Sequence, residues 1–290
     1  MLERFAERRI RTTGTGIFLR MGGNGPPLLL LHGYPQTHVI WHRVAPALAR
    51  SFTVACADLR GYGDSGKPEG GPPAYAKRAM AQDMVEVMAA LGHERFMVAG
   101  HDRGGRVAHR LCLDHPGHVA RAAVLDIVPT RTVFAATDQA LATGYYHWFF
   151  LSQPAPLPER LIGHERLFYL HAKLARWAGT QDLSWLDPAA LGEYERCFTP
   201  ATIHASCDDY RAAATLDLAD DAADEAARIA CPLLVLWGEL GLMHRSFDVL
   251  ATWRAKAAGE VEGRALPCGH FLPEEQPDAT ARELRHFFAG

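Results

Sequence analysis

The chain has 290 residues, a length typical of one large domain or two coupled ones. Apolar residues make up 48% of it and charged residues 22%, a globular composition that excludes a disordered chain, a collagen and a coiled coil. The 30 Lys and Arg residues against 33 Asp and Glu give a net charge of −3, so no overall basic field points to nucleic acid.

No segment has the pattern of a membrane span or a secretory signal. The longest strongly apolar stretch near the start, residues 28–31, is far too short to cross a bilayer. The first residues mix acids with bases and lack an apolar core, unlike a signal peptide. The six cysteines form no C-x-x-C pair and no metal-ligand spacing. We therefore expect free thiols, a cytoplasmic protein and no bound metal.

The elements predicted in chain order are strands that alternate with helices. Residues 5–21 have the pattern of an antiparallel hairpin that turns at residues 13–16. Apolar runs predict buried strands at 28–32, 52–57, 96–100, 120–128 and 232–237. Helices are predicted at 75–91, 103–115 and about 277–288. This alternation is typical of a mostly parallel sheet with helices on both faces.

The alternation is interrupted between about Pro129 and Ile229. This stretch has no strand-like run and is rich in Leu, Ala and aromatic residues at helical spacing. We therefore predict an all-helical cap, residues 129–229, between two strands of a core made of residues 1–128 and 230–290. Ligands bind at the carboxyl edge of a parallel sheet, so an insertion at that edge would act as a lid.

A nucleophile elbow is predicted where Gly100-His-Asp-Arg-Gly104 joins a strand to a helix. The flanking glycines permit a tight turn, and the central residue is Asp102. Alone, Asp102 could simply cap the helix that follows. A carboxylate that displaces a leaving group from an sp³ carbon forms an ester that water can hydrolyse, whereas a serine would form a stable ether. Asp at this position therefore favours displacement at an alkyl carbon over acyl transfer.

Hydrolysis of such an ester requires a base that activates water, and a carboxylate that orients the base. His270, in Cys268-Gly-His-Phe-Leu272 before the last helix, is the base by position. Two carboxylates could orient it, namely Asp126 at the end of an apolar strand and Glu239 shortly after the next strand. Because a charge in an apolar run requires a partner, we prefer Asp126.

Backbone amides complete the predicted hydrolytic site. The turn His32-Gly-Tyr-Pro35 follows a strand and can present the N–H of Tyr34 toward the nucleophile. With the N–H of Arg103, it would form an oxyanion hole during ester hydrolysis. Residues 58–66 form a Gly-rich structural loop in our interpretation, because they lack the G-K-[ST] of a phosphate-binding loop.

Two arginines predict an anionic substrate. Arg103 and Arg106 are three residues apart at a helix start, so their side chains lie on one face. Two guanidinium groups beside an anionic nucleophile would bind a small carboxylate bidentately, and the helix N-terminus favours an anion. One arginine could instead pair with a structural carboxylate, an alternative that is acceptable for Arg106 alone.

These motifs together resemble the Asp-nucleophile branch of the α/β-hydrolase superfamily, and within it the fluoroacetate (haloacetate) dehalogenases. The resemblance covers nearly the whole chain. Its specific part is Asp102-Arg-Gly-Gly-Arg106 with His147-Trp148, and it also includes residues 32–37, 58–65, 124–126 and 269–270. It implies an α/β-hydrolase fold with a helical cap, and hydrolysis of haloacetates such as fluoroacetate. It also implies a homodimer without a metal or an organic cofactor.

The resemblance further implies roles for individual residues. Asp102 would be the nucleophile, Arg103 and Arg106 would bind the substrate carboxylate, and the acid would follow the sixth strand, in agreement with Asp126. Three cap residues would hold the halide, namely His147, Trp148 and Tyr210. Fluoride leaves carbon poorly, so converging hydrogen-bond donors of this kind suit it. Trp148 could instead only pack the cap, and nothing but the family pattern selects Tyr210 over Tyr194 or Tyr169.

Three other functions remain open. An epoxide hydrolase shares the H-G-x-P turn, the Asp elbow and a helical cap, and Tyr145 or Tyr146 with Tyr210 could protonate its epoxide. A neutral substrate leaves the two arginines unexplained, and a haloalkane dehalogenase meets the same objection. A ligand-binding receptor on a degenerate hydrolase scaffold would be expected to lack one of Asp102, His270 and Asp126, and all three are present.

Overall fold

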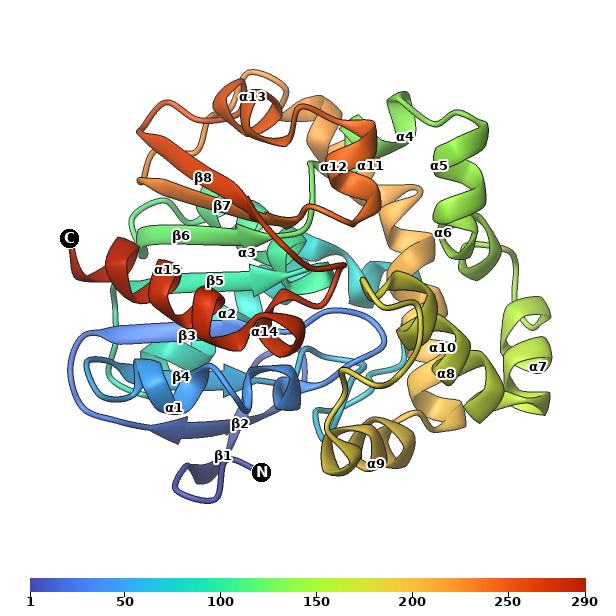
Figure 1. Cartoon of the computed structure of the whole chain (residues 1–290), viewed down its shortest axis with the longest axis horizontal. Helices are drawn as coiled ribbons and strands as arrows, with labels where there is room; N and C mark the ends of the chain where they lie inside the picture. Colours follow the sequence, from blue (N-terminus) through green and yellow to red (C-terminus); the bar gives the residue numbers. More distant parts are fainter.

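Eight strands form one central sheet in the structure, a computed structural model that describes residues 1–290 (Figure 1). They are β1 (Ala6–Arg11), β2 (Gly16–Gly22), β3 (Pro27–Leu31), β4 (Thr53–Ala57), β5 (Phe96–His101), β6 (Val119–Leu125), β7 (Leu233–Gly238) and β8 (Val261–Leu266). Their order in the sheet is β1-β2-β4-β3-β5-β6-β7-β8. Strands β1 and β2 run antiparallel to their neighbours, and all the other pairs are parallel. The predicted fold class and the N-terminal hairpin are confirmed.

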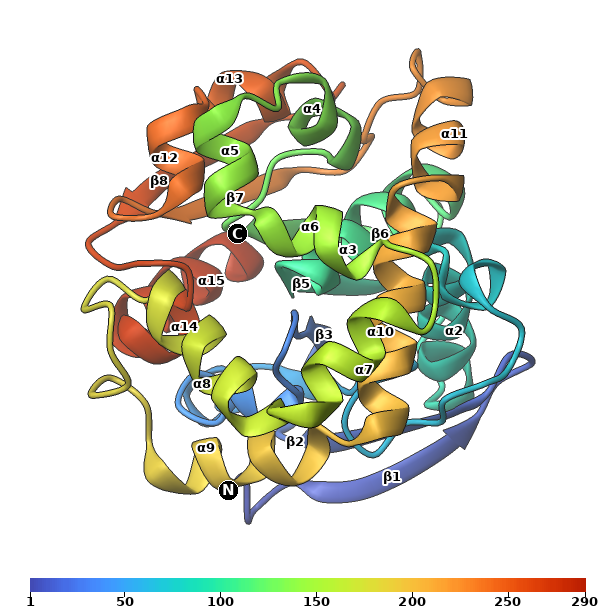
Figure 2. The ribbon, with the colours of Figure 1, turned by 90° about the vertical axis from the view of Figure 1, so that its right-hand side faces the viewer.

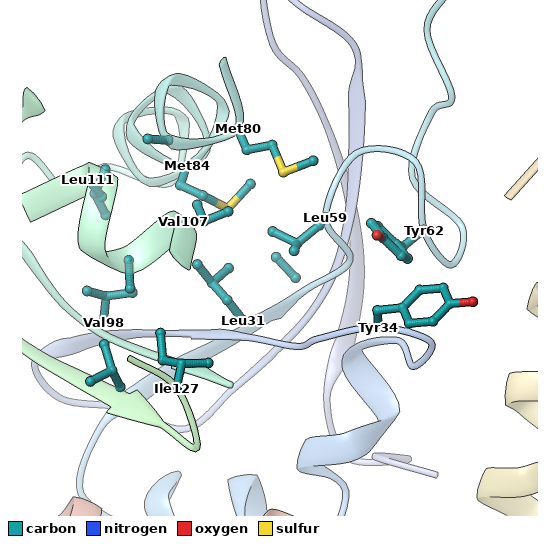
Figure 3. Close-up of a cluster of buried hydrophobic side chains, with 14 of the residues drawn as sticks. Leu31, Tyr34, Leu59, Tyr62, Met80, Met84, Val98, Val107, Leu111 and Ile127 are labelled. Carbon is teal, nitrogen blue, oxygen red and sulfur yellow. The ribbon is translucent and has the colours of Figure 1, made fainter. Parts of the chain in front are cut away.

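Helices cover both faces of the sheet, because its central strands are apolar on both faces. Leu29 and Leu31 of β3 belong to a cluster with α2 (Lys77–Ala90) and α3 (Arg103–Asp114). Figure 3 shows this cluster, with Tyr34 at its edge and the Tyr34 hydroxyl pointing away from Leu31. The alternate residues Leu28 and Leu30 pack in a second cluster. Its helices are α1 (Ala45–Leu48) and α15 (Pro277–Ala289).

Eight helices and no strand lie between β6 and β7. These helices lie beyond the carboxyl ends of the parallel strands (Figure 1), and Figure 2 looks onto the layer that they form. The helical cap in the predicted fold class is therefore confirmed, and the division at residues 128/129 and 229/230 stays a prediction. The helices are α4 (Thr130–Ala135), α5 (Gln139–Gly144), α6 (Tyr146–Leu151), α7 (Leu157–His164), α8 (Arg166–Trp177), α9 (Pro188–Cys197), α10 (Pro200–Ala213) and α11 (Leu216–Ala223).

The remaining helices are short and belong to the core. They are η1 (His38–Trp41), η2 (Pro72–Tyr75), α12 (Leu242–Ser246), α13 (Val249–Arg254) and α14 (Leu272–Glu275). None of the helices in the structure is both long and apolar enough to cross a membrane.

Two strands of the structure differ from the prediction, one in its end and one in its presence. The predicted strand 120–128 ends at Leu125, because Asp126 takes a φ of 53°, which a strand does not accommodate. The last strand, β8, was not predicted from the sequence. It lies at the edge of the sheet, and Glu262 and Arg264 on it are exposed, so it has no continuous apolar run.

Candidate active site

The predicted elbow lies between β5 and α3, with Asp102 at its tip. Asp102 has a φ of 47°, a conformation rare for residues other than glycine. A Cβ on Gly100 would lie 2.2 Å from the carbonyl oxygen of Gly104, so the turn requires glycine there. Asp102 occupies the N-cap position of α3, but its side chain accepts no capping hydrogen bond. The alternative that Asp102 merely caps the helix is therefore wrong.

The Asp102 carboxylate is buried and faces the turn after β3. Its Oδ1 accepts a hydrogen bond from the Tyr34 N–H at 2.9 Å. A Cβ on Gly33 would lie 2.4 Å from the Asp102 Cβ, so glycine is needed for this close approach. Burial alone would raise the pKa of Asp102, but the surrounding positive charges, foremost His270, lower it below its ordinary value. The side chain is therefore an anion at neutral pH.

His270 stands between the two aspartates. Its Nδ1 lies 2.6 Å from Asp126 Oδ2, and its Nε2 lies 4.0 Å from Asp102 Oδ2 and has no hydrogen-bond partner. The other Asp126 oxygen accepts the Gly238 N–H at 2.9 Å. Burial opposes a charged imidazole, yet the hydrogen bond to Asp126 and its charge raise the pKa of His270 above its ordinary value. The alternative orienting acid, Glu239, is exposed to solvent.

Arg103 is fully buried and forms an ion pair with a carboxylate of the cap. Its Nε and Nη2 donate to Asp209 of α10 at 2.9 and 2.5 Å, and its Nη1 has no partner. Asp209 also accepts hydrogen bonds from the Lys77 ammonium and, at 2.7 Å, from the Tyr62 hydroxyl. Burial alone would raise the pKa of Asp209, but the charges of Arg103 and Lys77 hold it well below its ordinary value.

This pairing corrects the expectation from the sequence. A structural carboxylate was acceptable for Arg106, whereas the structure places one on Arg103. Arg106 donates only to neutral oxygens, from Nη1 to the Val128 carbonyl at 2.9 Å and to the Thr130 hydroxyl at 3.1 Å. Its Nε and Nη2 are buried without partners. An anion beside Asp102 would therefore meet one free nitrogen of Arg103 and two of Arg106, rather than two complete guanidinium groups.

The three predicted halide ligands lie together on the cap side, and all three are buried. His147 and Trp148 come from α6 and Tyr210 comes from α10. The ring centroid of Tyr210 lies 5.3 Å from that of His147 and 6.1 Å from that of Trp148. The Tyr210 hydroxyl and His147 Nδ1 have no partners. Burial and the nearby Lys173 charge hold the pKa of His147 well below its ordinary value, so the ring is neutral.

The two arginines connect this side to the elbow. The Arg103 guanidinium lies 4.3 Å from the Tyr210 ring centroid, and that of Arg106 lies 4.5 Å from the Trp148 ring centroid. Of the other tyrosines considered, Tyr194 donates its hydroxyl to Glu274 at 2.9 Å and is thus engaged elsewhere. Cation–π contacts of this kind hold the arginines against the rings and leave their free N–H groups for a ligand.

A cavity of about 640 Å³ leads to the base from the boundary of cap and core. Tyr145, Trp177 and His270 line its inner part. Arg176 from the cap and Arg245 from the core line it as well, and both are exposed. The exposed carboxylate of Glu239 lines this cavity too, so its exposed rim carries two positive charges against one negative charge, a balance that favours an anion.

Sequence reasoning missed several residues of this site. Asp209 adjoins Tyr210, but nothing in the pattern of α10 shows that its carboxylate reaches Arg103. His101 was missed too, and its Nε2 lies 2.7 Å from the His270 carbonyl oxygen, with the two rings 4.5 Å apart. A buried residue before the nucleophile that holds the backbone of the base leaves no sequence signal.

Comparison with known proteins identifies the family of the chain. Residues 26–277 match the family model described as the alpha/beta hydrolase fold, so the chain belongs to that family. The crystal structure of an alpha/beta hydrolase from Nostoc sp PCC 7120 is 56% identical, with a TM-score of 0.97 over 99% of each chain.

Curated relatives narrow the family. A fluoroacetate dehalogenase from Burkholderia sp is 47% identical over 292 aligned positions, which cover 100% of this chain and 95% of the relative. A soluble epoxide hydrolase from Corynebacterium sp. (strain C12) is more distant, at 34% identity over 92% of this chain and 91% of the relative. The chain is thus an enzyme of the fluoroacetate dehalogenase family.

Proposed function

We propose that the protein hydrolyses haloacetates, converting fluoroacetate to glycolate and fluoride through an ester on Asp102. The observation that carries this proposal is the set of buried, unpartnered guanidinium nitrogens beside Asp102, on Arg103 and Arg106. A small carboxylate fits these donors, and a neutral substrate would leave them unpaired at a cost in free energy. The proposed reaction uses side chains and water alone.

In the first step, an oxygen of Asp102 attacks the carbon that carries the halogen. The carbon–halogen bond breaks, its electron pair leaves with the halide, and an ester to Asp102 forms. Arg103 Nη1 and Arg106 Nε and Nη2 hold the substrate carboxylate during this displacement. His147, Trp148 and Tyr210 would donate hydrogen bonds to the halide as its negative charge develops.

In the second step, His270 takes a proton from water, and the resulting hydroxide attacks the carbonyl carbon of the ester. The gap of 4.0 Å between His270 Nε2 and Asp102 Oδ2 keeps the base close to this carbon. Two backbone groups would stabilise the oxyanion, the N–H of Tyr34 and the N–H of Arg103. The Tyr34 N–H donates a hydrogen bond to Asp102 Oδ1 in the structure. The ester then breaks, and the departing oxygen of glycolate takes the proton from His270. The Asp102 carboxyl group loses its own proton to solvent and is restored as a carboxylate.

The experiment that tests this proposal compares anionic with neutral substrates. We expect release of fluoride, chloride and bromide from the three haloacetates, and little release of bromide from bromoethane at the same concentration. Halide-selective electrodes measure each product. Equal turnover of bromoethane and bromoacetate would contradict a site that selects a carboxylate.

Epoxide hydrolysis is the second candidate, and one observation favours it. Tyr145 and Tyr210 are both buried near the site, so they form a pair that could protonate an epoxide, whereas Tyr146 is 38% exposed. Diol formation from styrene oxide, measured beside fluoride release from fluoroacetate, separates the two functions. Diol without fluoride would favour this second candidate.

We also propose that the protein is a cytoplasmic homodimer. Large apolar side chains are exposed on α7 and α8, at Leu157, Leu161 and Phe168, and a second copy would cover them. No cysteine is in a disulfide, which suits a reducing compartment. Light scattering of the wild type and of Leu161→Glu would test the dimer, and a monomeric wild type would contradict it.

A further inference from the structure

Lys173 of α8 is a buried charge that the proposed mechanism does not use. The residue is 1% exposed, its ammonium has no hydrogen-bond partner, and it forms no ion pair. Burial, together with the positive charge of Arg176, lowers the pKa of Lys173 to about 7. Burial thus disfavours the ammonium form, and an anion beside the Lys173 nitrogen would stabilise it.

Three aromatic side chains contact this ammonium, and Tyr34 adjoins one of them, Tyr169. We term this group the Lys173 chamber, made of Lys173, Tyr146, Tyr169, Trp177 and Tyr34. The Lys173 Nζ lies 3.4 Å from the ring centroid of Tyr146, 5.4 Å from that of Tyr169 and 5.2 Å from that of Trp177. Tyr169, Lys173 and Trp177 are four residues apart and share one face of α8.

The chamber contains further polar groups that the protein satisfies only in part. The indole N–H of Trp177 is buried without a partner. The buried hydroxyls of Tyr34 and Tyr169 lie close to each other and have no other strong acceptor. Contacts with ring faces offset only part of the cost of burying an ammonium, and they do not satisfy the indole proton of Trp177. A small anion would satisfy several of these groups at once.

The chamber adjoins the proposed halide site and extends toward the surface. The Trp177 ring lies 4.5 Å from the His147 ring, and the Tyr34 ring lies 5.4 Å from that of Tyr210. Tyr34 projects from the core with its hydroxyl away from the aliphatic cluster (Figure 3). On the other side, Tyr146 covers Lys173 and is itself 38% exposed.

We propose that the Lys173 chamber is a second anion site, which binds the halide ion between its release at His147, Trp148 and Tyr210 and its exit to solvent. The identity of the ion as a product rests on the proposed function. The binding of a halide at Lys173 does not, because it is tested with bromide alone and without substrate.

The test is anomalous diffraction from crystals soaked in graded concentrations of sodium bromide, with chloride-free buffer. For the wild type, we expect a bromide peak beside Lys173 Nζ, apart from any peak at Trp148 and Tyr210. In Lys173→Met, the concentration for half occupancy should rise roughly tenfold or more, because a charge-assisted contact is lost. Arg176→Met removes a nearby positive charge outside the chamber and should retain the peak.

Three outcomes would overturn the proposal. They are no peak at Lys173 in the wild type, an unchanged peak in Lys173→Met, and an equal loss in Arg176→Met. Lys173→Met should fold with a melting temperature no lower than that of the wild type, since methionine removes an unpaired buried charge. Lys173→Gln serves in its place if that variant is insoluble. A missing peak at Trp148 and Tyr210 would instead contradict the halide site of the proposed function.

Discussion

The elbow side and the cap side of the site are built in different ways. Asp102, Asp126 and His270 lie in loops at strand ends, and hydrogen bonds with backbone groups anchor them, from the Tyr34 N–H to Asp102 and from the His270 N–H to the Trp177 carbonyl. His147, Trp148 and Tyr210 lie on helices and are held by packing of their rings. In the proposed mechanism, the elbow side would carry out displacement and hydrolysis, and the cap side would adapt them to a particular leaving group.

The largest effect is expected on the elbow side, from Asp102→Asn. An amide is a poor nucleophile, so turnover should fall by about 10⁴-fold or more for every halide. Release of fluoride and of bromide measures it. A variant that kept normal release of either halide would show that the nucleophile lies elsewhere.

His270→Asn should separate the two steps. Alkylation does not need the base, whereas hydrolysis does, so the variant should accumulate a carboxymethyl ester on Asp102. Mass spectrometry of the intact protein and of its peptides detects the adduct, and wild type incubated alike serves as the control. An unmodified variant after long incubation would mean that His270 acts before the ester forms.

The cap side should be sensitive to the identity of the halide, and Trp148→Phe tests this. The change keeps most of the ring and removes one N–H, which in oxyanion holes raises the barrier by about 2.7–4 kcal/mol. Fluoroacetate turnover should therefore fall roughly 100- to 1,000-fold, and bromoacetate turnover far less. His147→Phe and Tyr210→Phe should follow the same pattern.

Trp185→Phe is the matched control for that substitution. Trp185 also belongs to the cap, but its N–H donates to the Asp182 carbonyl. Equal losses for fluoroacetate and bromoacetate in Trp148→Phe, together with a lower melting temperature, would assign Trp148 to packing.

The arginines lie where the two sides meet, and they should behave differently from each other. Arg106→Leu should weaken haloacetate binding by about 2–4 kcal/mol, because the carboxylate loses charge-assisted contacts. Bromoethane should show no such penalty. Arg103→Leu should also lower the melting temperature, because it leaves Asp209 with Lys77 and Tyr62 alone. The same melting temperature for both variants would contradict this distinction.

The smallest effect is expected from pH. Only neutral His270 can accept a proton from water, so hydrolysis should slow as the pH falls through the raised pKa of His270. Alkylation by Asp102 should continue in that range, because its pKa is lowered. Stopped-flow measurements of ester formation and steady-state turnover distinguish the two. If both rates fell together, a group other than His270 would control them.

The elbow side could be predicted from the sequence because local patterns specify it. A buried strand followed by glycines around Asp102 requires a tight turn, and an aspartate after the apolar run that ends at Leu125 requires a buried partner. Strand order then brings Asp126 and His270 together, since β6, β7 and β8 are neighbours. The parallel sheet was predictable for the same reason, and the half-exposed edge strand β8 was not.

The cap side could not be predicted from its own pattern. Helical periodicity shows that α8 and α10 have apolar faces, but the way one helix packs against the core depends on side chains far away in sequence. The Asp209 carboxylate reaches Arg103 across 106 positions, and Lys77 across 132. The family resemblance supplied His147, Trp148 and Tyr210, whereas Asp209 and Lys173 had no signal at all.

The buried contacts of Asp209 also determine how molecules reach the nucleophile. Moving the cap away from the core would separate the Asp209 carboxylate from Arg103, Lys77 and Tyr62. Buried charges that are stable as pairs would then lose their partners, at a large cost in free energy. We therefore expect the cap to stay on the core during turnover, and substrates to enter through openings that side-chain rotations create. Entry would then select substrates by size. A bulky 2-haloacid would be turned over slowly because it enters the site slowly, even where its carbon–halogen bond is weaker than that of fluoroacetate.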